Sequence, residues 1–314
     1  LLGALAGAVS VRWFTLAVNA KGPLAAEKLI YIPPASSIKT ITKKLSDEGA
    51  IDNRAAFLID AHLQNRIGEL KAGEYKFAPG MTISDIITLL QSGKTYQRHI
   101  TIPEGLTVFD ILALLNAEPA LVGPVVMPPA EGSLLPETYN FSYGDTKQSV
   151  VERMKKSMEE TLGALWPKRT ADLLLQTPQA AVVLASIVEK ETALAAERPR
   201  VAGVFLNRLQ KHIPLQSDPT VIYAVTGGKE KLDRPLSLQD LRSPSPYNTY
   251  MAVDLPPTAI ANPGKASLAA VLNPEKNDYL YFVADGTGGH AFAKTLKEHN
   301  RNVARWRQIE NTQP

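Results

Sequence analysis

The sequence predicts an α+β protein in which a small β/α module precedes a larger mixed α/β domain. Three observations support this class: a strand–turn–helix pattern recurs early in the 314-residue chain, helical segments follow it, and proline-rich loops occupy much of the last third. Hydrophobic residues make up 45% of the chain and charged residues 21%, as is typical of a folded globular protein. The length favours about two domains.

The composition excludes several classes of function. The chain has no cysteine, so it can form no disulfide, thiolate nucleophile or Cys-ligated metal site. Its five histidines lack the spacing of a zinc site, and the sequence contains no phosphate-binding loop. The net charge is +3, without the basic and aromatic runs of nucleic-acid-binding proteins. We therefore expect no metal, no cofactor and no nucleic-acid partner.

The first residues form an apolar run that Arg12 interrupts just before Trp13. Because a membrane-spanning helix needs about 20 apolar residues, we interpret residues 1–20 as the truncated part of a transmembrane signal anchor. The alternative is the tail of a signal peptide with a cleavage site around Ala6 and Ala8. The anchor interpretation places the rest of the chain on the periplasmic or other extracytoplasmic side of the cytoplasmic (inner) membrane.

A turn followed by a short helix recurs three times between residues 30 and 118. The copies begin at Pro34, Pro79 and Pro103, and each has a Ser or Thr helix cap followed by apolar residues one helical turn apart. A β-prone run precedes each copy, and Gly49 and Gly93 lie where the first two helices should end. The first two copies resemble LysM-type modules, which bind glycans containing N-acetylglucosamine. Residues 25–100 are therefore predicted to form a LysM-like β/α domain.

A connector rich in proline and glycine, residues 124–136, leads into the second part of the chain. Helices are predicted from Thr146 to about Leu165, from Pro178 to Glu191, and over about residues 199–209. Residues 214–223 and 243–250 contain so many prolines that we predict rigid loops there. Their amide, carboxylate and tyrosine side chains suit a groove that binds sugars. The candidate groove residues are Gln216, Asp218, Tyr247, Asn248 and Tyr250.

Two carboxylates end the helix that begins at Pro178. Glu189 and Glu191 are separated by about 200° around the helix axis, so they cannot share a face. Glu191 lies one turn after Ile187 and Val188, on the more apolar face. Loss of hydration there raises a carboxyl pKa toward the range of a general acid. Either glutamate can also be read as an ordinary solvated side chain of an amphipathic helix.

Taken together, these segments resemble the endolytic murein transglycosylases, the MltG or YceG-like family. The resemblance covers nearly the whole chain, and one departure is Ser133–Leu135, where relatives often carry aromatic residues. The matching motifs lie in residues 131–139, 185–193, 204–209, 215–223, 245–250, 255–264 and 279–292.

The resemblance implies a catalytic domain over residues 101–314 that cleaves the β-1,4 bond from N-acetylmuramic acid to N-acetylglucosamine and leaves a 1,6-anhydro end. Such a reaction needs a single carboxyl group as general acid and base, because the C6 hydroxyl of the sugar is the nucleophile. Other lytic transglycosylases end their catalytic helix in Glu-Ser, which Glu191–Thr192 matches better than Glu189–Lys190. We therefore assign Glu191 as the acid and expect Glu189 to support it or to orient the substrate.

The resemblance also implies partners and a role. We expect Glu137 and Tyr139 of the connector motif to join the groove residues in binding peptidoglycan strands. Penicillin-binding synthases are the expected protein partners, and the cellular role would be to terminate the elongation of nascent glycan strands. Two alternatives remain open. A hydrolytic muramidase would take Asp218 or Glu137 as its second carboxylate, and a non-catalytic scaffold would bind peptidoglycan through the LysM-like repeats.

Overall fold

The computed structural model describes residues 2–63 and 69–310, with side chains from residue 9 onward. The chain divides into two compact units. Unit 1 comprises Leu1–His99 and Asn140–Asp145, and unit 2 comprises Ile100–Tyr139 and Thr146–Pro314. The mixed α/β class is confirmed, and the sheets of the described residues are small pairs: β1 with β2, β3 with β4, and β5 with β6. The chain changes unit within β3 (Arg98–Thr101) and β4 (Thr138–Phe141).

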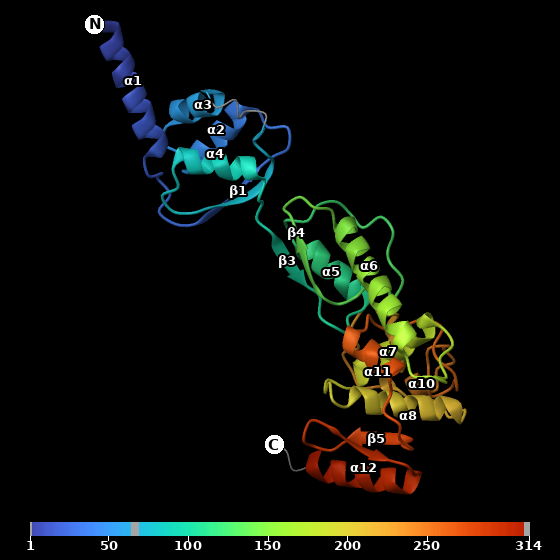
Figure 1. Ribbon diagram of the computed structural model, residues 1–314. Coiled ribbons are helices and arrows are strands. Elements are labelled where there is room, and N and C mark those ends of the chain that lie inside the picture. The colour runs from blue at the N-terminus through green and yellow to red at the C-terminus, as the bar shows by residue number, and fades with distance from the viewer. Residues whose placement is uncertain (1, 64–68, 311–314) are drawn as a thin grey trace. The chain divides into compact units, whose positions relative to one another are not determined.

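Unit 1 packs helices against the antiparallel β1/β2 pair, in which Lys28 lies opposite Phe77 and Ile32 opposite Gly73 (Figure 1). Apolar side chains from these elements form one core, and Phe57, Tyr75 and Phe77 are fully buried in it. The elements of unit 1 are α1 (Leu2–Asn19), β1 (Lys28–Ile32), α2 (Ile38–Asp47), α3 (Arg54–Leu63), β2 (Gly73–Phe77) and α4 (Ile83–Ser92).

The three predicted turn–helix copies each form a helix, but the three helices do not all belong to one unit. Thr82 and Asp85 form a reciprocal capping box at the start of α4, and Gly93 ends this helix at φ 66°. Helix α3 separates the first two copies and was not predicted from the sequence. The third copy forms α5 (Val108–Ala117), which belongs to unit 2. The likeness of unit 1 to LysM modules stays a prediction.

Helix α1 carries exposed apolar side chains at Val9, Val11, Trp13 and Leu16, whereas Val18 joins the core of unit 1. Within the part of the chain that the structure describes, no helix is both long enough and apolar enough to span a membrane. The anchor therefore also stays a prediction.

Unit 2 is organised around α7 (Pro178–Glu191), whose residues 181–188 are all buried. The hydroxyl of Thr177 accepts the Ala180 N–H, and Pro178 occupies the first turn, so the helix begins where the sequence predicts. Helix α7 packs against α8 (Arg198–Gln210) and α11 (Lys265–Leu272) (Figure 1). The other elements are α6 (Lys147–Leu165), the 3₁₀ turn Trp166–Lys168, α9 (Asp218–Thr226), α10 (Leu238–Leu241), β5 (Tyr281–Ala284), β6 (His290–Ala293) and α12 (Leu296–Glu310).

One predicted loop is partly wrong. Residues 214–223 are not all irregular, because α9 begins at Asp218 and continues to Thr226. Pro219 lies in the first turn of α9, where a backbone N–H has no partner within the helix, so this proline begins the helix instead of preventing it. The second proline-rich segment, residues 243–250, is irregular as predicted.

Candidate active site

Glu191 lies at the C-terminal end of α7 and lines a cavity of about 420 Å³. The hydroxyl of Ser217 donates a hydrogen bond to Glu191 Oε1 at 2.5 Å. Burial raises the pKa of Glu191 to about 7; the charge of Asp218 adds to this effect, while the Ser217 hydrogen bond and His290 oppose it. A carboxyl group with this pKa can both donate and accept a proton near neutral pH.

A network of buried hydroxyl groups holds Ser217 in place. The Ser217 N–H donates to Thr249 Oγ1 at 3.1 Å, and the Thr220 hydroxyl donates to the Ser217 carbonyl at 2.6 Å. The hydroxyl oxygens of Thr220 and Thr249 are 2.8 Å apart, and all three side chains are buried. The network joins the start of α9 to the segment 243–250 and so fixes the donor to Glu191.

Three predicted groove residues, Gln216, Asp218 and Tyr250, line the same cavity as Glu191. The Tyr250 hydroxyl donates to Asp218 Oδ1 at 2.6 Å, and burial together with this carboxylate raises the pKa of Tyr250 above its ordinary value. Gln216 has a left-handed backbone at φ 54°, and its side-chain oxygen accepts a hydrogen bond from Arg208. The structure thus brings a carboxylate, an amide and a phenol to the Glu191 cavity.

Asn248 does not line this cavity. It is fully buried, and its Nδ2 donates to the carbonyl oxygens of Asp240, Leu241 and Ser243. Its Oδ1 accepts the Tyr250 N–H at 3.0 Å. Asn248 therefore supports the loop from which Tyr250 reaches the cavity.

Tyr247 is also placed elsewhere. Its ring centroid lies 5.0 Å from that of Tyr223, and its hydroxyl is 2.8 Å from Thr258 Oγ1. These contacts pack Tyr247 against the core of unit 2. The structure gives it a packing role where sequence analysis predicts sugar stacking.

Glu137 and Tyr139 line a separate cavity, together with Ser157 and Lys168. Tyr139 is buried, and its hydroxyl donates to the Leu135 carbonyl at 2.7 Å. Neither residue lines the Glu191 cavity, so of the two candidates for a second carboxylate only Asp218 shares a cavity with Glu191.

Glu189 forms a buried ion pair. Arg198 donates to its Oε1 at 2.9 Å and the Gly264 N–H donates to its Oε2 at 2.9 Å, and the two ion-paired side chains are only 4% and 10% exposed. Glu104 lies 3.3 Å from the same guanidinium group. Both oxygens of Glu189 are thus engaged in tying α7 to α8 and to the start of α11. The contrast between the two glutamates supports the assignment of Glu191 as the acid.

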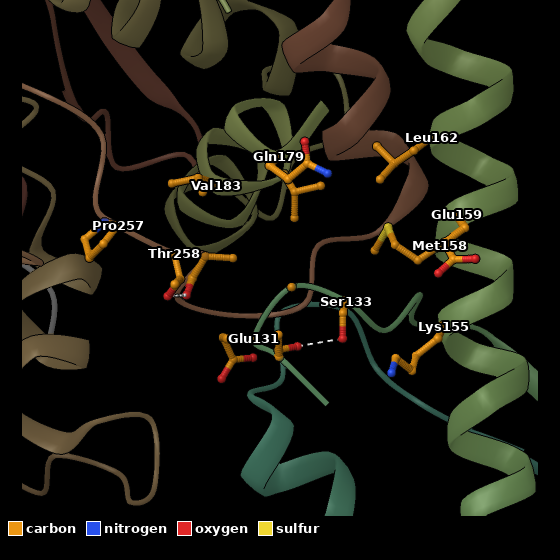
Figure 2. Close-up of a pocket in the computed structure, with 14 residues that line it drawn as sticks. Glu131, Ser133, Lys155, Met158, Glu159, Leu162, Gln179, Val183, Pro257 and Thr258 are labelled. Atoms are coloured by element: carbon orange, nitrogen blue, oxygen red, sulfur yellow. Dashed lines mark hydrogen bonds between the residues drawn. The ribbon is translucent and has the colours of Figure 1, made fainter. Parts of the chain in front are cut away.

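A second carboxyl group with a raised pKa lies in another cavity of unit 2. This cavity has a volume of about 320 Å³, and Glu131 and Thr258 both line it. Figure 2 shows Lys155 and Glu159 of α6 among the other lining residues. Burial raises the pKa of Glu131 to about 7. Glu131 Oε1 accepts the Val108 N–H at 3.0 Å and Asn262 Nδ2 at 2.9 Å, so it holds the start of α5.

The cavity residues that come from the end of the chain were not predicted from the sequence. Tyr281 of β5, His299 of α12 and Arg208 of α8 line the Glu191 cavity. Arg208 donates hydrogen bonds to the Leu280 carbonyl and to the side-chain oxygen of Gln216. Only the family motif of residues 279–292 pointed to this region, and it does not include His299. Within the described residues, no group of three or more His, Asp or Glu side chains is arranged to hold a metal ion.

Comparisons with known proteins agree on one family. The YceG-like family matches residues 30–305. The chain is 35% identical to an endolytic murein transglycosylase of Bacillus subtilis, over 90% of this chain and 85% of the relative. It is 30% identical to an endolytic murein transglycosylase of Streptococcus pneumoniae, over 87% of this chain but only 57% of that longer protein. A crystal structure of a YceG-like protein from Listeria monocytogenes matches with a TM-score of 0.55 and 33% identity, over 88% of this chain and 98% of that one.

Proposed function

This chain belongs to the YceG-like family, and we propose that it is an endolytic murein transglycosylase with Glu191 as its single general acid and base. The family resemblance found in the sequence motifs is confirmed, and the enzyme class that follows is lytic transglycosylase, a lyase of polysaccharides. The observation that carries the residue assignment is the environment of Glu191. It is a carboxyl group of pKa about 7 in a cavity that also contains an amide, a carboxylate and a phenol.

The proposed reaction needs only this one carboxyl group. Protonated Glu191 gives its proton to the oxygen of the β-1,4 bond as the bond to the anomeric carbon of N-acetylmuramic acid breaks. The resulting carboxylate then accepts the proton of the C6 hydroxyl of the same sugar as that oxygen bonds to the anomeric carbon. The products are a 1,6-anhydromuramyl end and a free N-acetylglucosamine hydroxyl. Asp218, as a neighbouring carboxylate, would stabilise positive charge that develops on the sugar ring.

Asp218 also supports a second candidate function, a hydrolytic muramidase that uses two carboxyl groups across the scissile bond. Mass analysis of digested glycan strands separates the two reactions. The transglycosylase produces anhydro ends, whereas the muramidase adds water and produces reducing ends. Glu191→Gln should lower the yield of either product by at least about a hundredfold, so wild-type-like cleavage by that variant would overturn the assignment of Glu191.

We further propose that the protein is anchored in the cytoplasmic membrane, with its catalytic part on the outer side. The exposed Val9, Val11, Trp13 and Leu16 of α1 support this placement, because lipid is a favourable environment for such a surface. Anchoring would raise the local concentration of the enzyme near nascent strands and penicillin-binding synthases. A LysM-like unit 1 would hold a strand while Glu191 cuts it, which would terminate its elongation.

The test of this placement is an exchange of residues 1–20 for a cleaved signal peptide. We expect the protein to be released and the distribution of glycan lengths to shift, although activity on purified strands is unchanged. If the released protein sets the same glycan lengths as the original one, anchoring is not part of the mechanism.

A further inference from the structure

The last strand pair and the C-terminal helix supply part of the Glu191 cavity wall. Tyr281 of β5 and His299 of α12 both line the cavity, and their rings stack at a centroid distance of 5.1 Å and an interplanar angle of 25°. Thr295 and Glu298 fix the start of α12, because each accepts the backbone N–H of the other. His299 is therefore held by a capped helix on one side and by an aromatic ring on the other.

The surroundings of His299 keep its imidazole neutral. Burial lowers the pKa of His299, and the positive charge of Arg208 lowers it further. Arg208 cannot turn away, because its guanidinium group donates to the carbonyl oxygens of Pro214 and Leu280 and to Gln216. It also lies 5.4 Å from the centroid of the Tyr281 ring. A neutral imidazole has one N–H donor and one lone pair.

The position of this single proton follows from burial. Nδ1 of His299 is buried, and among the described residues it has no hydrogen-bond partner. A buried N–H without an acceptor is costly, and a buried lone pair without a donor is tolerated more readily. The proton therefore belongs on Nε2, which likewise has no protein partner among the hydrogen bonds of the described residues. Because His299 lines the Glu191 cavity, a ligand bound there can supply an acceptor for this N–H.

We propose that His299 is a substrate-binding residue whose Nε2–H donates a hydrogen bond to an oxygen of an N-acetylated sugar bound beside Glu191. The inference rests on the proposed function, since the ligand is a sugar of the glycan strand. Hydroxyl and acetamido oxygens of such a sugar are suitable acceptors. A neutral donor also suits this cavity because a second cation near Glu191 would favour its carboxylate and weaken its action as an acid.

Affinity measurements in a non-cleaving background test this role. The parent protein carries Glu191→Gln, and the probe is purified, uncrosslinked glycan strands of alternating N-acetylglucosamine and N-acetylmuramic acid. Adding His299→Phe keeps an aromatic ring against Tyr281 but removes the donor, and the Kd should rise by roughly three- to tenfold, as for a lost neutral hydrogen bond. Adding His299→Gln restores an N–H near the position of Nε2 and should restore most of the affinity. Gln308→Leu, at an exposed position of the same helix that does not line the cavity, is the control and should leave the Kd unchanged.

The outcomes distinguish a failure of the proposed role of His299 from a failure of the proposed function. A Phe variant that binds as tightly as the parent, or a Gln variant that binds as weakly as the Phe variant, overturns the role of His299. If the Phe variant melts early, His299→Asn replaces it, because its shorter amide cannot reach the position of Nε2 and should bind more weakly than Gln. Failure of the wild-type chain to cut strands, with no binding by the parent, overturns the proposed function itself.

Discussion

Replacing Ser217 with alanine should move the pH dependence of cleavage to higher pH. The Ser217 hydroxyl donates to Glu191 Oε1 at 2.5 Å and favours the ionised carboxylate, so it holds the pKa of Glu191 below the value that burial alone would produce. A hydrogen bond to a charged group contributes about 1.5–3 kcal/mol, and one pKa unit corresponds to about 1.4 kcal/mol. Its loss should therefore raise the pKa of Glu191 by roughly one to two units.

The assay is the pH profile of kcat/KM on purified glycan strands. In the proposed mechanism cleavage needs protonated Glu191, so the rate should fall as the pH rises through the pKa of this group in the free enzyme. In the wild type this descending limb should lie near pH 7, the value to which burial raises the pKa. In Ser217→Ala it should lie roughly one to two pH units higher.

Asp218→Asn provides a matched variant with the opposite sign. The negative charge of Asp218 raises the pKa of Glu191, so its removal should move the descending limb to lower pH. The shift should be smaller than that of Ser217→Ala, because Asp218 is exposed and water and salt screen its charge. The asparagine still offers an oxygen to the Tyr250 hydroxyl. Limbs that stay in place, or that move in the same direction in both variants, would refute the reasoning.

Glu191→Gln should lower cleavage by at least about a hundredfold, measured on the same strands, because the amide cannot carry the proton. The pKa of Glu191 is raised from 4.5 to about 7, so the stability it contributes is complete below the lower value and is lost as pH rises through the upper one. In urea unfolding, the free energy of unfolding of Glu191→Gln should therefore increase relative to that of the wild type as the pH rises from acid to alkaline. A difference between the two proteins that stays the same across this pH range would contradict the burial of this carboxyl. Glu189→Ala leaves Arg198 with only the half-exposed Glu104 and should destabilise the fold by about 3–5 kcal/mol in urea unfolding; a stable but inactive variant would return the catalytic role to Glu189. Tyr247→Ala should lower the melting temperature and preserve the kinetics of the folded protein, since Tyr247 packs on Tyr223 and Thr258; weaker glycan binding at unchanged stability would instead place this ring at the substrate.

Features that depend on neighbouring residues could be predicted from the sequence. The start of α7 follows from Thr177 and Pro178, and the limits of α4 follow from Thr82 and Gly93, because caps and turns act within a few residues. The difference between the two glutamates of α7 was visible too, since helical geometry alone directs them to different faces.

Features that depend on tertiary contacts could not be predicted. Asn248 and Tyr250 lie two positions apart in one proline-rich segment, yet the first turns inward to backbone carbonyls and the second reaches Asp218. No local pattern decides between these outcomes, because the loop supplies the acceptors only after it has folded. The hydrogen bond from Ser217 to Glu191 and the place of His299 in the wall of the same cavity likewise require contacts across long stretches of chain.

The return of Asn140–Asp145 to unit 1 ties the folding of the two units together during synthesis. Tyr143 places its ring 4.5 Å from that of Tyr31, and Ser142 accepts a hydrogen bond from Gln97 at 3.1 Å, so the returning segment adds real contacts to the first unit. By the time the ribosome has released this segment, α5 of unit 2 has already emerged. A fragment that stops at His99 would lack these contacts, and no single cut in the chain yields a complete first unit alone. The two units are therefore not expected to be exchanged between proteins as separate modules.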